Sequence, residues 1–248
     1  MATGIHISLA PEIIGHLAGF PITNSMLGML VSAIILILVA RAAGRKPMLK
    51  PSKMQNAGEM VMEFLLNLMD SVTYNREKSK KFFPIISTIF LFVIVMNWSG
   101  LLPIYGTIGI NHIEDGQKVF VPFLRGGAAD LNMTVAIAMV SVIAAQVFGI
   151  LYIGAKKHWK KYFTTNPVMA FPGIIEFIGE FTKIISFSFR LFGNVFAGEV
   201  LLVVISTLVP LLAPVPFYAL ELFVGFIQAL VFALLSLVFF TVATAEEH

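Results

Sequence analysis

The sequence predicts an all-α, polytopic membrane protein with about five membrane-spanning segments. Of its 248 residues, 58% are hydrophobic and only 12% are charged, against about 25% charged in an average soluble domain. The mean hydropathy is +0.88. Apolar stretches of about 20 residues, long enough to cross a bilayer, recur along the chain. They cover residues 24–42, 83–104, 131–154, 171–209 and 217–243.

The distribution of lysine and arginine between these stretches predicts the orientation. Nine of the 17 basic residues fall in 41–81 and four in 155–170, whereas 105–130 holds two and 1–23 holds none. Because basic loops stay on the cytoplasmic side, we expect the N-terminus outside and the C-terminus in the cytoplasm. The predicted segments are an outer N-terminus with the first span (1–43), a cytoplasmic basic and amphipathic segment (44–82), and a remainder with four further membrane segments (83–248).

Two connecting segments carry patterns of their own. Residues 52–81 mix apolar side chains with Glu59, Glu63 and Asp70, which predicts an amphipathic helix on the cytoplasmic surface or a soluble collar rather than a span. The loop 105–130 contains the turn-rich stretch "INHIEDGQ", which favours a small hairpin.

The fourth apolar stretch is too long for one upright crossing. Its 39 residues, at ~1.5 Å each, reach about 58 Å, against a hydrocarbon core of ~30 Å. The stretch is therefore expected to tilt, to bend, or to begin along the membrane surface. The "PLLAPVP" that follows it predicts a turn, so the last two segments should form a long antiparallel hairpin.

Arg190 lies inside this stretch, in "IISFSFRLFGNVFAGEVLLVVI". A charged residue at mid-membrane costs from ~3 to ~15 kcal/mol and usually marks a functional site. At 100° per residue, Asn194 shares the helix face of Arg190, and Glu199 points the opposite way. Because arginine does not release its proton, we predict a fixed charge that attracts an anion or bars cations. Pairing with a lipid phosphate or a buried acid for stability is the alternative.

The predicted hairpin brings polar residues together in two layers. Glu199 and Glu221 are nearly equidistant from Pro210, and so are Arg190 and Gln228. Two adjacent carboxylates can share a proton, which suits a proton relay. Either glutamate could instead be an interfacial residue that reaches water. A proton carrier with its own negative charge would have to come from outside the hairpin.

Other polar residues near or within the spans leave two roles open. Lys183 either takes part in the function of the site or extends its ammonium to the cytoplasmic surface. Asn194 and Gln228 either line a path or form hydrogen bonds between helices. Asp130, in "AADLN", either caps the third span or gives protons access. Asn97 could pack a bend before Pro103.

Several stretches resemble subunit a of F-type ATP synthases, the membrane stator protein beside the rotating c-ring. They are "SFRLFGNVFAGE", "GFIQALVFALLSLVFFTVA" with the terminal "EEH", "MNWSGLLP" and "ADLNMT", within residues 80–248. The resemblance implies that Arg190 is the stator arginine that faces the c-ring carboxylate, with Gln228 as its neighbour and Asn194 on the path. Glu199 would belong to the outer half-channel, Glu221 stands where some members have histidine, and Glu176 would lie toward the cytoplasmic exit. One departure is Ile184, where many members have proline.

The resemblance also implies the setting. The partners would be a c-ring, peripheral-stalk b subunits, the remaining ATP synthase subunits and the lipid bilayer of a bacterial inner membrane, without nucleic acid. Residues 83–248 would be the proton-channel domain of a non-catalytic subunit, with no cofactor and no metal. The chain has no "GxxxxGK[ST]" loop for nucleotide. A self-contained proton-coupled secondary transporter is the alternative, although such folds usually contain internal repeats, which the sequence lacks.

Overall fold

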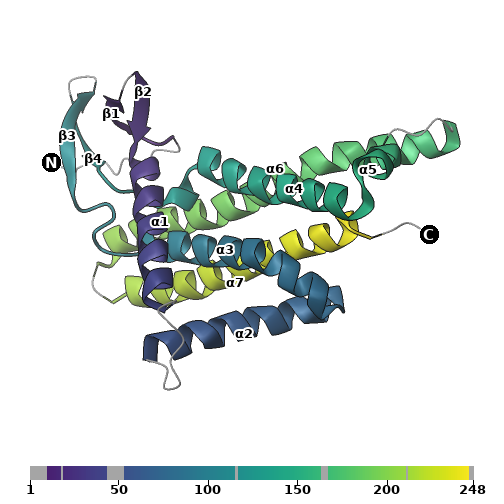
Figure 1. Ribbon diagram of the computed structural model, residues 1–248. Coiled ribbons are helices and arrows are strands. Elements are labelled where there is room, and N and C mark those ends of the chain that lie inside the picture. Colours follow the sequence, from purple (N-terminus) through teal and green to yellow (C-terminus); the bar gives the residue numbers. More distant parts are fainter. Residues whose placement is uncertain are drawn as a thin grey trace. The chain divides into compact units, whose positions relative to one another are not determined.

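The computed structural model describes residues 10–17, 19–43, 53–114, 117–162, 167–210 and 212–245. Figure 1 shows a helical protein with two small β-hairpins. In chain order the elements are β1 (Ile13–Leu17), β2 (Phe20–Thr23), α1 (Asn24–Ala43), α2 (Lys53–Thr73), α3 (Arg76–Ser99), β3 (Gly109–Glu114), β4 (Gln117–Pro122), the 3-10 turn η1 (Gly127–Ala129), α4 (Leu131–Ile153), α5 (Ala155–Tyr162), α6 (Pro167–Leu208) and α7 (Pro214–Ala243).

Within the described residues, five helices are long and apolar enough to cross a membrane: α1, α3, α4, α6 and α7. This confirms the predicted all-α class and the five spans. The second span differs in its limits, because α3 begins seven residues before the predicted 83 and ends at Ser99. Asn75 explains the early start, since its side-chain oxygen accepts hydrogen bonds from the backbone N–H groups of Glu77 and Lys78 and so caps the helix.

The predicted amphipathic helix is present as α2. It buries Leu65 and Met69, whereas Met60, nine residues before Met69 and so on the opposite face, is exposed. Its placement on a cytoplasmic surface stays a prediction. The basic loop that follows α4 also contains a helix, α5, which the sequence did not predict; it starts after Gly154, whose φ of 87° is a left-handed conformation that suits glycine.

The two hairpins had different sequence signals. The loop that contains "INHIEDGQ" includes β3 and β4, which pair antiparallel from Gly109–Pro122 to Glu114–Gln117, as expected. The β1–β2 hairpin was not predicted. Its strands pair from Ile13–Thr23 to Leu17–Phe20, with Gly19 at φ 88° next to the turn, and it leads directly into α1 (Figure 1).

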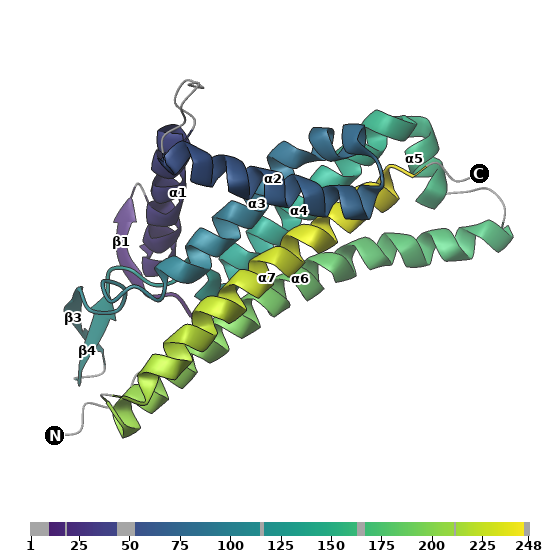
Figure 2. The same ribbon diagram turned by 90° about the horizontal axis from the view of Figure 1, so that it is seen from below.

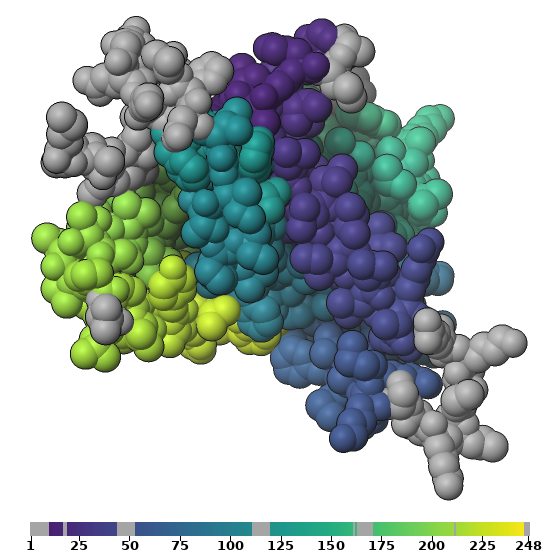
Figure 3. Space-filling model, turned by 90° about the vertical axis from the view of Figure 1, so that its left-hand side faces the viewer, coloured from purple at the N-terminus to yellow at the C-terminus, as the bar shows by residue number. Residues whose placement is uncertain are grey.

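The chain divides into two compact units, to which the long helices α3, α4, α6 and α7 all contribute. Unit 1 consists of Met1–Val39, Leu91–Thr134 and Arg190–Gln228, and unit 2 of Ala40–Phe90, Val135–Phe189 and Ala229–His248. In unit 1 the segment after α3 lies between α1 and the turn that joins α6 to α7 (Figure 3). The core of unit 2 is aromatic: the rings of Phe82, Phe148 and Phe240 lie 4.9–5.6 Å apart by their centroids.

Helices α6 and α7 run side by side as the predicted antiparallel hairpin (Figure 2). α6 is one continuous helix of 42 residues, with Pro172 inside its first two turns. In unit 2 the ring centroids of Phe187 and Phe232 lie 4.6 Å apart, and in unit 1 the carboxyl group of Glu221 lies against Gly198. Each pair is equidistant from Pro210 within one residue, so both contacts follow the register expected from the sequence.

Candidate functional site

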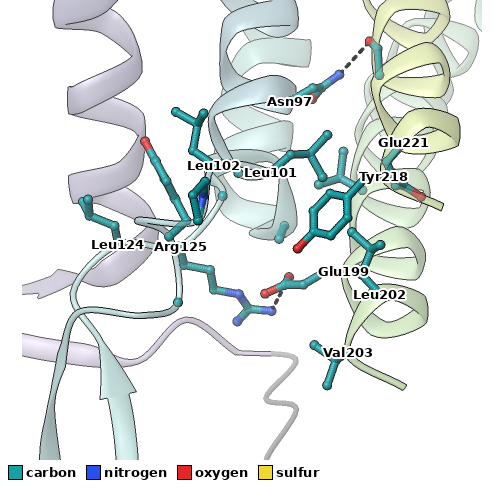
Figure 4. A pocket seen from close by; sticks show the side chains of 18 of the residues that line it. Asn97, Leu101, Leu102, Leu124, Arg125, Glu199, Leu202, Val203, Tyr218 and Glu221 are labelled. Carbon is teal, nitrogen blue, oxygen red and sulfur yellow. Dashed lines mark hydrogen bonds and ion pairs between the residues drawn. The ribbon is translucent and has the colours of Figure 1, made fainter. Parts of the chain in front are cut away.

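Unit 1 contains a cavity of about 310 Å³ between α3, α6, α7 and the loops on either side of the β3–β4 hairpin. We call it the acidic cavity because two glutamates line it. Figure 4 shows how side chains from different elements converge on it. Its polar and charged lining includes Asn97, Tyr105, Arg125, Asn194, Glu199, Tyr218 and Glu221.

The two glutamates predicted to form one layer both line the acidic cavity, but they have different surroundings. Glu199, on α6, accepts a hydrogen bond from the Arg125 guanidinium, with 3.3 Å between Nη2 and Oε2. Glu221, on α7, places its carboxyl group against the backbone of Gly198. A methyl group at position 198 would overlap it, so glycine is what lets the carboxyl approach α6 this closely.

Among the residues of this site that were not expected from the sequence are Arg125, Tyr105 and Tyr218. The Arg125 side chain is 8% exposed, and its guanidinium also donates a hydrogen bond to the Ala10 carbonyl oxygen at 3.3 Å. Tyr218 extends from α7 with its hydroxyl pointing toward Glu199 in Figure 4. Arg125 could have been noticed, because it is one of only two basic residues between 105 and 130. Tyr218 carried no signal beyond being a polar aromatic residue near a helix start.

Asn97 joins α3 to α7 at the acidic cavity. Its Nδ2 donates a hydrogen bond to the Gly225 carbonyl oxygen at 3.0 Å, and the neighbouring Trp98 donates one from Nε1 to the Leu222 carbonyl oxygen at the same distance. Gly225 makes this approach possible, because a Cβ there would lie 3.3 Å from the Asn97 Cβ. These two bonds hold the turn of α7 that carries Glu221.

Arg190 lies on an exposed face of α6, and Gln228 is buried on α7. Only 6% of Gln228 is exposed, and its Nε2 has no hydrogen-bond partner among the described residues. Asn194, one turn after Arg190, lines the acidic cavity. Phe189, which precedes Arg190, is 56% exposed, so an apolar side chain is exposed next to this arginine on α6.

Asp130 forms the cap that the sequence left open as one of two roles. Its Oδ1 accepts a hydrogen bond from the Asn132 backbone N–H at 2.9 Å, at the first turn of α4. Its Oδ2 accepts a second bond from the Ser25 hydroxyl at 2.6 Å, which joins the start of α4 to the start of α1. The aspartate is 2% exposed. A role in proton access stays a prediction.

Unit 2 contains a second group of polar residues, which we call the Gln146 cluster: Gln146, His158, Tyr162, Glu176, Glu180 and Lys183. They line a cavity of about 10 Å³, the size of a single water molecule. The Lys183 ammonium pairs with Glu180 at 2.6 Å and lies 4.6 Å from the centre of the Phe239 ring. Lys183 and Glu176 were expected from the sequence as candidate site residues, whereas this lysine's partner, Glu180, was not.

The remaining contacts of the Gln146 cluster come from α5. Gln146 Oε1 accepts a hydrogen bond from the Tyr162 hydroxyl at 3.3 Å and lies 2.7 Å from His158 Nε2. Since an amide oxygen only accepts, His158 carries a proton on Nε2. Burial and the nearby Glu180 carboxylate raise the pKa of Tyr162 to about 12, so its hydroxyl stays protonated at physiological pH. No cluster of three or more His, Cys, Asp or Glu that could hold a metal occurs in the described part of the chain.

The fold is that of a polytopic, all-α membrane protein whose long helices carry ionisable residues into cavities. A sequence model described as "ATP synthase A chain" matches residues 26–241. The chain therefore belongs to the ATP synthase A chain family, which confirms the resemblance found in the sequence. It is a multi-pass membrane component of an ATP synthase.

Proposed function

We propose that the chain is the ion-translocating stator subunit of a rotary F-type ATP synthase, with Arg190 as a fixed charge that faces a c-ring carboxylate. The observation that supports this best is the arrangement of α6 in unit 1. Arg190 is exposed, whereas Glu199, nine residues on, lines the acidic cavity. An exposed arginine on an apolar membrane helix is accessible to a negatively charged group of a neighbouring protein, and a c-ring carboxylate is such a group.

Two half-channels would serve this arginine. The acidic cavity suits the outer one, because Glu199, Glu221 and Asn194 line it together with the asparagine of α3, Asn97. The Gln146 cluster suits the inner one, since Glu176 and Lys183 belong to it and the basic loops predict that its side is cytoplasmic. Gln228 would lie beside Arg190, and Asp130 would hold the start of α4 near the outer path.

The mechanism follows from charge. A proton from the outer half-channel neutralises a c-ring carboxylate, which can then leave the arginine and move through lipid. On its return the carboxylate meets Arg190, whose permanent positive charge favours the ionised form, so the proton is released to the inner half-channel. The chain carries out no ATP chemistry in this scheme. Its partners are the c-ring, the peripheral-stalk b subunits and the remaining subunits in a bacterial inner membrane.

Replacing Arg190 by alanine in the assembled complex tests the proposal. We expect Arg190→Ala to abolish ATP synthesis in membrane vesicles and to permit a passive proton leak, because nothing would strip the proton from a passing carboxylate. Arg76→Ala is the matched control: Arg76 pairs with Asp70 outside the predicted spans, and its loss should leave synthesis intact. Near-normal ATP synthesis in the Arg190→Ala variant would contradict the proposal.

Reconstitution addresses the alternative of a self-contained transporter. The purified chain alone should move no protons in liposomes, whereas the chain with its ring should conduct them. Proton transport by the chain alone would favour the transporter.

A further inference from the structure

Arg125 is a buried cation at the wall of the acidic cavity. Its side chain is 8% exposed, whereas 38% of the Glu199 side chain remains exposed, so the pair has one enclosed partner and one partner open to the cavity. In Figure 4 the guanidinium reaches the glutamate from the loop that follows β4. Its Nε is buried without a hydrogen-bond partner among the described residues, which leaves the Glu199 carboxylate and the Ala10 carbonyl as its acceptors there.

The backbone of Arg125 is fixed by α1 rather than by the helices of the hairpin. Its N–H donates a hydrogen bond to the Asn24 carbonyl oxygen at 3.4 Å. Its own carbonyl oxygen lies so close to Gly28 that a side chain at position 28 would overlap it. The positive charge is thus held in place by α1, and Glu199 meets it from α6.

Glu221 has a different environment at the same cavity. No ion pair to Glu221 occurs in the part of the chain that the structure describes, and its carboxyl group lies against the backbone of Gly198. The titratable groups that line the cavity are Arg125, Glu199, Glu221, Tyr105 and Tyr218. Of these, Arg125 is the only one that is always a cation.

We propose that Arg125 is a positioning residue that holds Glu199 as a fixed anion, so that Glu221 is the acid of this cavity that exchanges protons. The proposal rests on the proposed function, in which the cavity is a proton half-channel. Two carboxyl groups near each other do not ionise equally, and a cation next to one of them decides which stays ionised. The ion pair also compensates the buried guanidinium, which would otherwise be an unpaired charge.

A structural role for Arg125 is the competing explanation, because the same side chain also binds Ala10. The two explanations differ in whether Arg125 acts through Glu199. If it does, removing Arg125 should matter little once Glu199 is already neutral. If Arg125 acts through Ala10 and α1, its removal should reduce proton pumping by the same factor whether position 199 is glutamate or glutamine.

A double-mutant cycle in the assembled complex separates them. ATP-driven proton pumping is measured in vesicles for Arg125→Gln, Glu199→Gln and the double variant. We expect each single variant to lose pumping about 10-fold or more and the double variant to pump at least as well as the worse single one. If the loss of pumping in the double variant equals the product of the two single-variant losses, the proposal is overturned. Glu221→Gln, combined with either single variant, should still remove the residual pumping.

Two further readouts keep the test decisive. Arg125→Gln should change the pH dependence of pumping on the cavity side, because it removes the charge paired with Glu199, and Glu199→Gln should abolish that change. Arg125→Lys, which keeps the charge, should pump better than Arg125→Gln. If Arg125→Gln does not assemble, assembly of the double variant supports the proposal, since the buried charges are then removed together, and failure of both overturns it.

Arg190→Ala in the same vesicles distinguishes this proposal from the proposed function. If Arg190→Ala retains coupled synthesis, the proposed function fails whatever the cycle shows. If Arg190→Ala abolishes synthesis while the losses at Arg125 and Glu199 multiply, only the assignment of Arg125 fails.

Discussion

The Glu221 carboxyl group lies against the backbone of Gly198, the residue directly before Glu199. A methyl group at position 198 would displace the carboxyl. Because this group is the end of a flexible side chain, the displacement costs little stability but changes where the acid sits. We predict that Gly198→Ala assembles normally and loses proton pumping about 10-fold or more, since misplacing a reacting group by 1 Å can cost about 100-fold.

Two comparisons check the Gly198→Ala prediction. Gly179→Ala adds the same methyl group to α6 where nothing lies within 4 Å, and it should pump like the parent complex. Glu221→Asp, combined with Gly198→Ala, shortens the acid and should recover part of the lost pumping. Full activity of Gly198→Ala would show that the position of the Glu221 carboxyl does not matter.

Gly28 on α1 should be far less tolerant of a side chain. A Cβ there would overlap the backbone carbonyl oxygen of Arg125, which cannot rotate away as a side chain does. We predict that Gly28→Ala destabilises the protein by about 1–3 kcal/mol, as overpacking does, and weakens the Arg125–Glu199 pair. Thermal melting of the purified complex measures the first effect. Gly15→Ala, in β1 with nothing within 4 Å, should melt like the parent, and equal melting of both variants would contradict the prediction.

The spans and the hairpin could be predicted because their signals are local. A run of apolar residues and the position of basic residues do not depend on distant contacts, and the prolines from 210 to 216 mark the turn from the sequence alone. The start of α3 was predicted too late because its first turns, "REKSKK", are polar. Hydropathy also gives no information about the cap formed by the Asn75 side chain. The β1–β2 hairpin was missed because neither of its short strands, "IIGHL" and "FPIT", alternates between polar and apolar residues.

The site was predicted unevenly for a similar reason. Periodicity relates residues on one helix, and the hairpin register extends that to α7, which is why Glu199 and Glu221 were expected on one layer. The partner of Glu199 is Arg125, which is 74 residues away on a loop, and no spacing rule connects them. Asn97 was identified as a candidate, but its bond to the Gly225 carbonyl spans 128 residues and needed the structure.

Tyr162 gives a prediction in alkaline solution. Its pKa is raised from 10.0 to about 12, chiefly by burial, so the folded state keeps the phenol proton after the unfolded chain has lost it. The resulting stability is fully present below pH 10.0 and is lost as the pH rises toward 12. Melting temperatures should therefore fall more steeply over this pH range in the parent than in Tyr162→Phe. Parallel pH profiles of the two proteins would contradict the assignment.

The ion pair between Lys183 and Glu180 leads to the last prediction. Their charged atoms are 2.6 Å apart, with 28% of the lysine side chain and 14% of the glutamate side chain exposed. Removing the lysine alone leaves a largely enclosed carboxylate, so Lys183→Met should destabilise the protein by about 1–3 kcal/mol, less than the ~3–5 kcal/mol of a fully buried pair. Adding Glu180→Gln removes the unpaired carboxylate, so the double variant should have a higher melting temperature than Lys183→Met alone. Proton pumping of the stable double variant then tests whether the pair takes part in transport. Pumping near the parent level would make Lys183 a counter-ion for Glu180, whereas loss of pumping in a well-assembled double variant would place the pair on the inner path. If Lys183→Met and Glu180→Gln instead each lower the melting temperature only slightly, and their effects add, the Lys183 ammonium is solvated by water rather than paired with Glu180. The pair then contributes neither to stability nor to proton pumping.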